Sequence, residues 1–415
     1  MKAKVAAVIG GGASGLAAAA ELLRASSGVK KRPRVVVFEA QERLARKLCA
    51  SGSGKCNLGN RHIDNSRYNG DKALISSYVT AYDAISDEEF LRDMGIYVTD
   101  DGSDRLYPMS FKADSVMTAM RGYCLSLGAE FSLADTITSV DRYGDRFLLN
   151  GSFIADAVIF ACGGPSAGRL GGSASGYDLL SSLGVPRPDV YPALCALVPD
   201  KKYWPASMRG TRAHCEVSLL VNGYRVRIES GEVQFNEKTV SGIPVMDLSG
   251  DAAAMLAAGR GVSLEINKSP DIPPDELYAI AYSLLSRGAY TRAEDIFACV
   301  MPRSLYHDDL RVCAIKPDET LSPEDDRLKK LCRRVSQCVY PIYGTAGFED
   351  AQAVRGGYGS DAVDPETCAL RSLGGVYVCG ELLDADGACG GYNLTFARCT
   401  GRTAGKSAAG LLLNK

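Results

Sequence analysis

The strongest constraint on the fold is a glycine pattern near the N-terminus. Gly10, Gly12 and Gly15 form the motif G-x-G-x-x-G, which follows the apolar segment KVAAVIG (residues 4–10). Such a run is typical of a buried strand, and the segment SGLAAAAELLRA that overlaps the end of the motif consists mainly of strong helix formers. RVVVFEA (residues 34–40) is a second apolar run. This order predicts a right-handed crossover between two parallel strands.

Each glycine has a mechanical role in such a unit. Gly10 permits the tight turn, Gly12 lets a pyrophosphate approach the backbone, and Gly15 allows the helix to pack closely on the strand. The first helical N–H groups, at Ala13 and Ser14, direct partial positive charge toward the phosphates. The motif therefore predicts a dinucleotide site.

An acid at the end of the second strand indicates which nucleotide binds. Glu39 lies 24 residues after Gly15, and Ala40 follows it. The Glu39 carboxylate can accept hydrogen bonds from a ribose 2′-hydroxyl and would repel a 2′-phosphate. We therefore expect a tightly held FAD or NAD, not NADP, with Glu39 and Ala40 among its contacts.

Composition excludes several other classes of protein. The chain has 415 residues, enough for two or three domains, and 46% of them are hydrophobic. The formal net charge of −2 gives no overall basic field for nucleic acid. No apolar run approaches the roughly 18 residues that a membrane helix needs, so we expect no membrane association. The N-terminal segment imitates a signal peptide, but its spaced glycines explain that composition better.

The cysteine and histidine content favours a reducing compartment and argues against a metal site. The 14 cysteines are scattered without a C-x-x-C pair, which predicts a cytoplasmic location. Only three histidines are present, so a zinc site is not expected.

The middle of the chain has a different character from its ends. AHCEVSLLV, Asn222-Gly223 and YRVRIE predict a β-hairpin with a type I′ turn. Three helical patterns follow, DELYAIAYSLLS, AEDIFACVM and SPEDDRLKKLCRRVSQC. We therefore predict an α/β fold in which a two-part Rossmann-like domain is interrupted by a β-rich and a helical domain. The expected segments are 1–189 and 340–415 for the nucleotide-binding domain, 190–268 for the β-rich insertion and 269–339 for the helical domain.

The C-terminal part favours FAD over NAD. FAD is extended and needs contacts beyond the first crossover unit. A late apolar strand ends in Gly380-Glu381, and a helix begins near Gly390-Gly391. The N–H groups at the start of this helix would face a flavin and favour its anionic reduced form.

The segment RKLCASGSGKCN (residues 46–57) allows several interpretations. Its glycines, cysteines and cationic side chains suit a phosphate cradle, a redox disulfide, a metal site or a plain loop. It lacks the G-x-x-x-x-G-K-[ST] spacing of a Walker A loop. Two reduced thiols at Cys49 and Cys56 are the simplest interpretation of its cysteines.

These motifs resemble one family over nearly the whole chain. VAAVIGGGASGLAAA, RKLCASGSGKCNLGN, RLYPMSFKA, ACGGPS, PALCALV, GEVQFNEKTVSGIP, AVRGGYG and GVYVCGELLDADGACGGYNLTFARCTG occur in family order. The pattern is similar to that of the three-domain bacterial flavoproteins of the BaiN/RdsA type, which include aminoacetone-oxidase-like proteins. The resemblance implies a two-part FAD-binding domain, a β-barrel-like insertion, a small helical domain and one FAD whose flavin faces a cleft beneath the inserted domains.

The resemblance also assigns cofactor contacts. It makes residues 46–57 a loop that lines FAD, and Ile137 matches the position whose backbone meets adenine. The other matches are Lys47, Ser51, Gly52, Cys56, Asn57, Ala161, Gly163, Gly380, Glu381, Gly391, Asn393 and Leu394. Three positions depart from the family pattern. Ala45 replaces a common glycine, FNEKT (235–239) replaces F-T-H-x-G, and SASG (173–176) lacks an acid. The last two departures face the expected substrate side, so the resemblance does not identify the small-molecule substrate.

A bound flavin predicts hydride transfer, and the resemblance suggests reduction of a carbon–carbon double bond or oxidation of an amine. No second G-x-G-x-x-G follows a strand, so NADH or NADPH is expected only as a transient electron donor. Tyr392 and Cys389, at the start of the flavin-side helix, are the candidate catalytic acids. Glu237 and Tyr107 are further candidates.

Two alternative functions stay open. The family includes a ribosomal RNA dihydrouridine synthase, and one predicted helix carries a basic cluster. The cluster consists of Arg327, Lys329, Lys330, Arg333 and Arg334. Residues 269–339 nevertheless hold 10 Lys or Arg against 12 Asp or Glu, which favours a solvated helix face over an RNA-binding patch. The other alternative is a flavin-binding module without turnover. The sequence predicts no oligomeric state.

Overall fold

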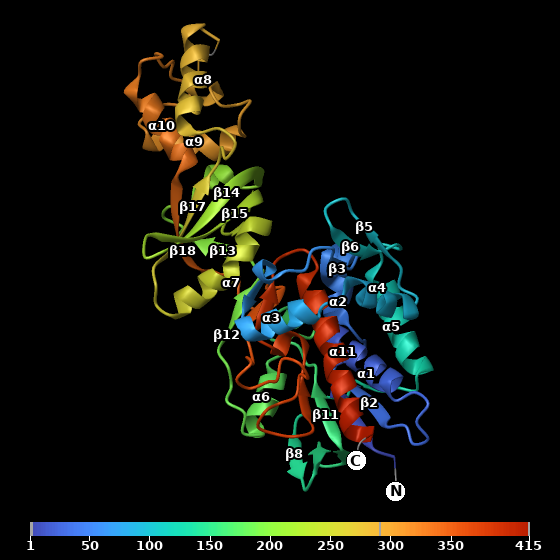
Figure 1. The fold of residues 1–415 in the computed structure, drawn as a ribbon. Coiled ribbons are helices and arrows are strands. Elements are labelled where there is room, and N and C mark those ends of the chain that lie inside the picture. The colour runs from blue at the N-terminus through green and yellow to red at the C-terminus, as the bar shows by residue number, and fades with distance from the viewer. Residues whose placement is uncertain (1–2, 290–291, 414–415) are drawn as a thin grey trace. The chain divides into compact units, whose positions relative to one another are not determined.

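The computed structural model describes residues 3–289 and 292–413, which form two compact units (Figure 1). The first unit contains the chain up to Tyr191 and again from Gln352, and the second unit contains Pro192–Ala351. The expected interruption of an α/β fold by an insertion is therefore confirmed.

A parallel sheet forms the centre of the first unit. Its strand order is β20-β11-β1-β2-β7, and every neighbouring pair is parallel. The strands are β1 (Val5–Ile9), β2 (Arg34–Glu39), β7 (Glu130–Leu133), β11 (Ala157–Phe160) and β20 (Val376–Val378). Because β1 lies between β2 and β11, the strand order reverses beside it, and such a switch point is where open α/β sheets bind ligands.

Both faces of this sheet are buried, which explains its continuous apolar strands. Ala6 and Val8 belong to one hydrophobic cluster, and Ala7 and Ile9 belong to another. The first cluster includes residues of α1 (Ala13–Ala25), α5 (Ala113–Ser126) and α11 (Tyr392–Leu413). Helix α11 lies beside α1 (Figure 1), so the end of the chain packs on its beginning.

The remaining elements of the first unit surround this sheet. A cluster of short elements follows β2, and two of its strands pair as a hairpin, Val98–Asp100 with Arg105–Pro108. A small antiparallel sheet of three strands lies within residues 140–155. The elements are α2 (Arg46–Ala50), β3 (Gly59–Asn60), β4 (Tyr68–Gly70), α3 (Lys72–Ala81), α4 (Ala84–Asp93), β5 (Val98–Asp100), β6 (Arg105–Pro108), β8 (Val140–Tyr143), β9 (Arg146–Leu149), β10 (Phe153–Ala155), α6 (Ser175–Ser182), β12 (Val190–Ala193), β19 (Ala353–Gly356) and β21 (Ala385–Gly387).

The second unit contains a closed barrel, as expected. Its order is β13-β16-β15-β14-β17-β18, and helix α7 (Ile243–Ala257) lies between two of its strands in sequence. The strands are β13 (Leu197–Pro199), β14 (Thr211–Val221), β15 (Tyr224–Phe235), β16 (Val240–Ser241), β17 (Val262–Asn267) and β18 (Cys338–Thr345). Asn222 and Gly223 have φ angles of +51° and +84°, which fits the predicted type I′ turn.

The helices described between β17 and β18 differ from the prediction, and one helix prediction was wrong. The helices are α8 (Pro274–Ser286), α9 (Arg303–Val312) and α10 (Asp326–Ser336). AEDIFACVM forms a short 3-10 helix, Ala293–Asp295, followed by turns, and the helix begins only after Pro302. Strand β18 closes the barrel, so residues 340–351 lie in the second unit, although we expected the nucleotide-binding domain to return at 340. A separate helical domain stays a prediction.

A buried ion pair connects these helices to the barrel. Lys268, at the end of β17, donates to Asp309 of α9 at 2.7 Å and to the Leu305 carbonyl at 2.8 Å. Both charged side chains are 1% exposed, and Arg334 of α10 lies 2.9 Å from the other Asp309 oxygen. Among residues 3–289 and 292–413, no helix is long and apolar enough to cross a membrane.

Candidate functional site

The three motif glycines of the turn after β1 differ in the space around them. A Cβ atom on Gly10 would overlap the carbonyl oxygen of Ala161, and one on Gly15 would overlap the carbonyl oxygen of Gly10. Gly10 also has a φ of +110°, which favours glycine. A Cβ on Gly12 would meet no atom within 4 Å. The space in front of Gly12 is therefore open to a ligand.

The N-terminus of α1 faces this turn with unpaired donors. Leu16 donates its N–H to the Gly12 carbonyl at 3.0 Å, as the first regular helical hydrogen bond. Within residues 3–289 and 292–413, the N–H groups of Ala13, Ser14 and Gly15 have no hydrogen-bond acceptor. Free N–H groups and the helix dipole together suit an anion such as a pyrophosphate.

Glu39 is fixed in position by the backbone. One carboxylate oxygen accepts the Gly11 N–H at 2.9 Å, and the other accepts the Gln41 N–H at 2.9 Å. Each oxygen keeps a second lone pair for a ligand. The carboxylate is therefore oriented next to the open Gly12 turn, with Ala40 following it in the chain, as the ribose interpretation requires.

The loop after β2 is built from residues in the left-handed region. Ala45 has a φ of +54°, and Gly52, Ser53 and Cys56 have φ values of +55°, +56° and +62°. A left-handed conformation favours glycine, which gives a physical reason for the glycine that the resembling family has in place of Ala45. The loop follows a tight path that regular secondary structure does not provide.

The cysteines of this loop are free thiols. Cys56 is buried, and burial raises its pKa to about 11. Burial, followed by the neighbouring Asp114, raises the pKa of Cys49 to about 11 as well. Both groups are neutral near pH 7, so neither has the thiolate character of a redox cysteine.

Three loops at the carboxyl edge of the sheet are joined by one polar cluster. Lys47, after β2, donates to Ser166 Oγ at 2.6 Å and to Glu381 Oε2 at 2.7 Å. The Gly164 N–H, after β11, donates to the same Glu381 oxygen at 2.9 Å. Our sequence reasoning missed Ser166, although it belongs to the quoted motif ACGGPS. The cluster brings two predicted cofactor residues, Lys47 and Glu381, into direct contact.

The C-terminal return meets the first crossover unit closely. A Cβ on Gly380 would lie 2.6 Å from Ser14 Oγ, so strand β20 ends against the start of α1. Asn393 accepts the Gly387 N–H at 2.9 Å and donates to the Gly387 carbonyl at 2.8 Å. In the described part of the chain, the N–H groups of Asn393 and Leu394 have no acceptor. A second helix start thus offers free donors.

The other predicted contacts are placed as follows. Ala161 is 4% exposed, and its N–H donates to the Ile9 carbonyl at 2.9 Å, which continues the sheet beneath Gly10. Gly163 lies next to the Glu381 carboxylate. Ser51 donates its hydroxyl to the Leu48 carbonyl at 2.7 Å, within the loop. Ile137 is 5% exposed and belongs to the second hydrophobic cluster.

The candidate catalytic acids differ in their surroundings. Tyr392 is 5% exposed, and its ring packs edge-on against Tyr68 at 5.8 Å. Cys389 carries a reduced thiol and is partly exposed. Tyr107 is buried beside Phe111, which raises its pKa. The fourth candidate is in the second unit, where Glu237 is exposed and pairs with Arg209 at 3.3 Å. All four candidates stay predictions.

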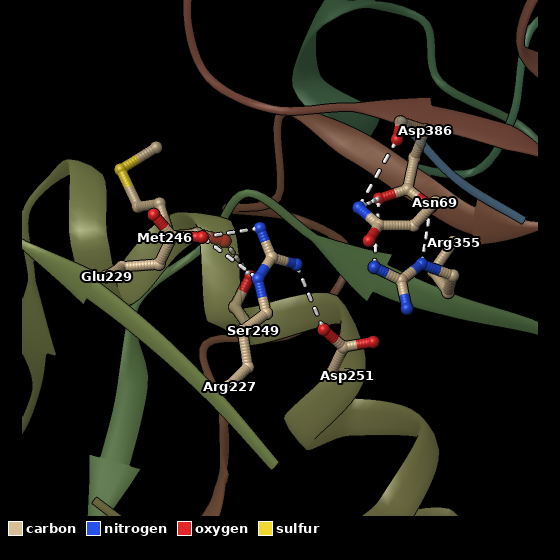
Figure 2. A network of polar contacts seen from close by, with 8 residues as sticks. All are labelled: Asn69, Arg227, Glu229, Met246, Ser249, Asp251, Arg355 and Asp386. Carbon is tan, nitrogen blue, oxygen red and sulfur yellow. Dashed lines mark hydrogen bonds and ion pairs between the residues drawn. The ribbon is translucent and has the colours of Figure 1, made fainter. Parts of the chain in front are cut away.

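A charged cluster joins β19, β21 and β4 in the first unit (Figure 2). Arg355 of β19 pairs with Asp386 of β21, whose side chain is 3% exposed, and Asn69 of β4 lies 3.5 Å from the same carboxylate. Burial, together with Asp386 and Asp71, raises the pKa of Asp384 to about 6 against the opposing effect of Arg355. Sequence reasoning did not single out these acids.

A second polar cluster in Figure 2 belongs to the barrel unit. Arg227 of β15 donates to Glu229 at 2.9 and 2.7 Å and to Asp251 of α7 at 3.1 Å. The bond to Asp251 fastens α7 to the barrel wall. Among residues 3–289 and 292–413, no group of three or more His, Cys, Asp or Glu side chains could hold a metal ion.

The residues present fit an extended dinucleotide. Gly12 leaves open space, α1 offers three free donors for phosphate, Glu39 is held beside them, and α11 offers two further donors. The fold and this site define a Rossmann-type dinucleotide-binding protein.

Comparison with known proteins gives the family. The HI0933-like protein Rossmann domain matches residues 4–407. A 3-dehydro-bile acid delta(4,6)-reductase of Clostridium scindens is 30% identical, with 97% of this chain and 98% of the relative covered. A ribosomal RNA dihydrouridine synthase of Haemophilus influenzae is 22% identical over 94% of each chain. The chain therefore belongs to the HI0933-like family, and it is an FAD-dependent oxidoreductase.

The matches also include a solved structure. A 3-ketosteroid delta1-dehydrogenase from Sterolibacterium denitrificans has a TM-score of 0.49 and 10% identity, with 98% of this chain and 99% of the other covered.

Proposed function

We propose that this oxidoreductase reduces a carbon–carbon double bond in a small organic molecule. The observation that supports this choice most strongly is the relationship to a bile acid reductase along the whole length of both chains. Amine oxidation, which the resemblance also suggested, has no such relative among those described above. The predicted catalytic and cofactor-binding residues are retained as the proposed site.

The chain's own residues perform binding and orientation in this proposal. The donors of Ala13, Ser14 and Gly15 hold the pyrophosphate, and Glu39 holds the adenosine ribose. Lys47 and Glu381 would be further contacts of the cofactor. FAD supplies the acceptance and donation of hydride.

The substrate end of the proposal involves the start of α11. The free N–H groups of Asn393 and Leu394 would stabilise negative charge on a flavin bound there. Tyr392 and Cys389 are the proposed proton donors to the substrate. A transient NADH or NADPH supplies the electrons.

A ribosomal RNA dihydrouridine synthase is the second candidate, because relatives with that name match along almost the whole chain. The charges of α10 do not support it. Arg327 pairs with Asp325 and Glu319, and Arg334 pairs with Asp309. These pairs neutralise two of the five basic residues that would have formed an RNA-binding patch.

One experiment separates these functions. The purified protein is reduced under argon with NADH or NADPH while the flavin absorbance near 450 nm is followed; that wavelength is about the usual flavin maximum. An unsaturated steroid ketone or a uridine-containing ribosomal RNA fragment is then added without oxygen. An amine is added to a separate sample of the oxidised protein, because an amine substrate would reduce the flavin. The proposal expects bleaching by a nicotinamide and reoxidation by the steroid ketone. Reoxidation by RNA alone would support the second candidate, and no bleaching by any donor would support a non-catalytic flavin module.

A further inference from the structure

Residues 57–60, at the end of the loop after β2, are joined to the start of α11 by hydrogen bonds between side chains and backbone. With its amide oriented by its hydrogen-bonding partners, Asn57 accepts the Gly391 N–H at 3.0 Å and donates to the Gly59 carbonyl at 2.9 Å. Asn60, which is 6% exposed, donates to the Gly390 carbonyl at 3.2 Å. Two asparagines thus hold the two glycines that precede the helix.

The same segment is fastened further along the helix. The Leu58 carbonyl accepts the Thr395 hydroxyl at 3.3 Å and an Arg398 N–H at 3.0 Å. Arg398 is buried and pairs with Asp87 at 2.8 Å, so the two charges compensate each other. Arg398 therefore provides a hydrogen-bond donor to the loop but no net charge. Residues 57–60 therefore lie along the first two turns of α11.

Close packing makes this arrangement specific. A Cβ on Gly391 would overlap the Gly59 carbonyl, and one on Gly390 would lie 3.1 Å from the Tyr392 ring. The loop and the helix start are in backbone contact there, so a shift of the loop must shift the helix start.

These bonds also decide which donors stay free. Asn57 occupies the Gly391 N–H, whereas the N–H groups of Asn393 and Leu394 have no acceptor within residues 3–289 and 292–413. The free donors at the positive end of α11 are therefore those of its second and third residues. The orientation of these two residues depends on where Asn57 and Asn60 hold the glycine pair.

We infer that Asn57 and Asn60 are positioning residues that aim the N-terminus of α11 at the flavin and thereby favour the reduced, anionic cofactor. This inference rests on the proposed placement of the flavin at α11. A helix N-terminus stabilises nearby negative charge, and the effect declines within the first turn. A small displacement of the helix start therefore changes the electrostatic stabilisation of the reduced flavin more than that of the oxidised one.

The test measures the flavin midpoint potential of the FAD-bound protein and of N57A, N60A and the control N65A, a substitution at an exposed position. We expect N57A and N60A to lower the preference for reduced over oxidised FAD by about tenfold, a shift of about 30 mV to more negative potential. N65A should leave the potential unchanged. FAD content, thermal midpoint and affinity for sulfite, which adds to electron-poor flavins, are recorded in parallel.

The outcomes separate this inference from the function on which it rests. An unchanged potential in both asparagine variants, with normal FAD content, would overturn the positioning role and leave the oxidoreductase proposal intact. If N57A does not fold, N60A gives the answer alone, because it removes a different bond to the same glycine pair. Failure of the parent protein to bind FAD would instead defeat the proposed function itself.

Discussion

Gly12 and Gly15 belong to one motif but would respond to the same substitution for different physical reasons. A methyl group on Gly15 would overlap a backbone carbonyl inside the protein, whereas one on Gly12 would point into open space. Gly12 also has a φ of −81° and a ψ of −170°, which alanine adopts without strain. The need for glycine at position 12 therefore comes from the ligand and not from the fold.

We predict that G12A folds normally but loses FAD. The thermal midpoint of the apoprotein should stay close to that of the parent, while the dissociation constant for FAD rises at least about 100-fold, or about 2.7 kcal/mol. Titration of each apoprotein with FAD, followed by flavin fluorescence, measures this change. G15A is the contrasting variant and should be unstable even without FAD. Normal FAD affinity in G12A would show that the pyrophosphate lies elsewhere.

Asp384 gives a prediction about pH. Its pKa is raised from 3.8 to about 6, because burial and the carboxylates of Asp386 and Asp71 disfavour its charge more than Arg355 favours it. The folded state therefore binds this proton more tightly than the unfolded state between those pH values. The contribution of Asp384 to stability must fall as pH rises from about 4 to about 6 and stay low above that range.

The substitution D384N removes this titration while nearly keeping the shape of the side chain. We expect D384N to be more stable than the parent at pH 7 and similar to it at pH 4, by thermal unfolding in matched buffers. D145N, at an exposed turn, should show no such difference. A parent-like midpoint for D384N at pH 7 would mean that Asp384 is not destabilised by its surroundings.

At the scale of elements, the packing of α11 on α1 depends on small residues. A Cβ on Gly401 would overlap the Ser14 carbonyl, and one on Gly405 would overlap the Ala18 carbonyl. Gly410 lies on the same helix but faces open space. The pair Gly401 and Gly410 therefore separates packing from helix propensity.

We predict opposite effects for the two substitutions. G401A should lower the free energy of unfolding by about 1–3 kcal/mol, because the helices must move apart. It should also weaken FAD binding, since Ser14 belongs to the proposed phosphate site. G410A should raise stability by up to about 1 kcal/mol, because alanine is the better helix former. Urea unfolding of both variants measures the difference, and equal destabilisation would contradict the packing argument.

Local signals predicted the elements whose pattern lies within a few residues. The hairpin at Asn222-Gly223 and the strands β1 and β2 follow from turn chemistry and apolar runs. Helix α9 was missed because its buried face includes Asp309, whose partner Lys268 is 41 residues away. A charge that is satisfied only by a distant residue hides the apolar stripe. The helix prediction for AEDIFACVM was wrong because apolar spacing alone does not distinguish a helix from turns. Its buried Phe297 and Met301 lie in turns before Pro302.

The residues of the proposed site also differ in whether a local pattern could predict them. Glycine spacing and Glu39 led to the proposed phosphate site at α1, because those residues lie within one crossover unit. The bonds of Asn57 to Gly391 and of Lys47 to Glu381 join segments more than 300 residues apart in the chain. No local pattern could pair them, and only the family resemblance placed these residues near the cofactor.

At the scale of the whole molecule, the two units have separate hydrophobic cores. The sheet and its helices bury two clusters, and the barrel with α8, α9 and α10 buries a third. All the cofactor-binding residues proposed here lie in the first unit. Ligand binding stabilises only the part of a protein that must be folded to bind it.

We therefore predict that calorimetry resolves two unfolding transitions that respond to different changes. FAD at 100 times its dissociation constant should stabilise the transition of the first unit by about 2.7 kcal/mol and leave the other nearly unchanged. K268M should lower only the second transition, by about 3 kcal/mol, because it leaves Asp309 buried with one cation fewer. K330M replaces an exposed lysine in the same unit and should lower neither. A single transition that FAD and K268M both shift would show that the two cores unfold as one.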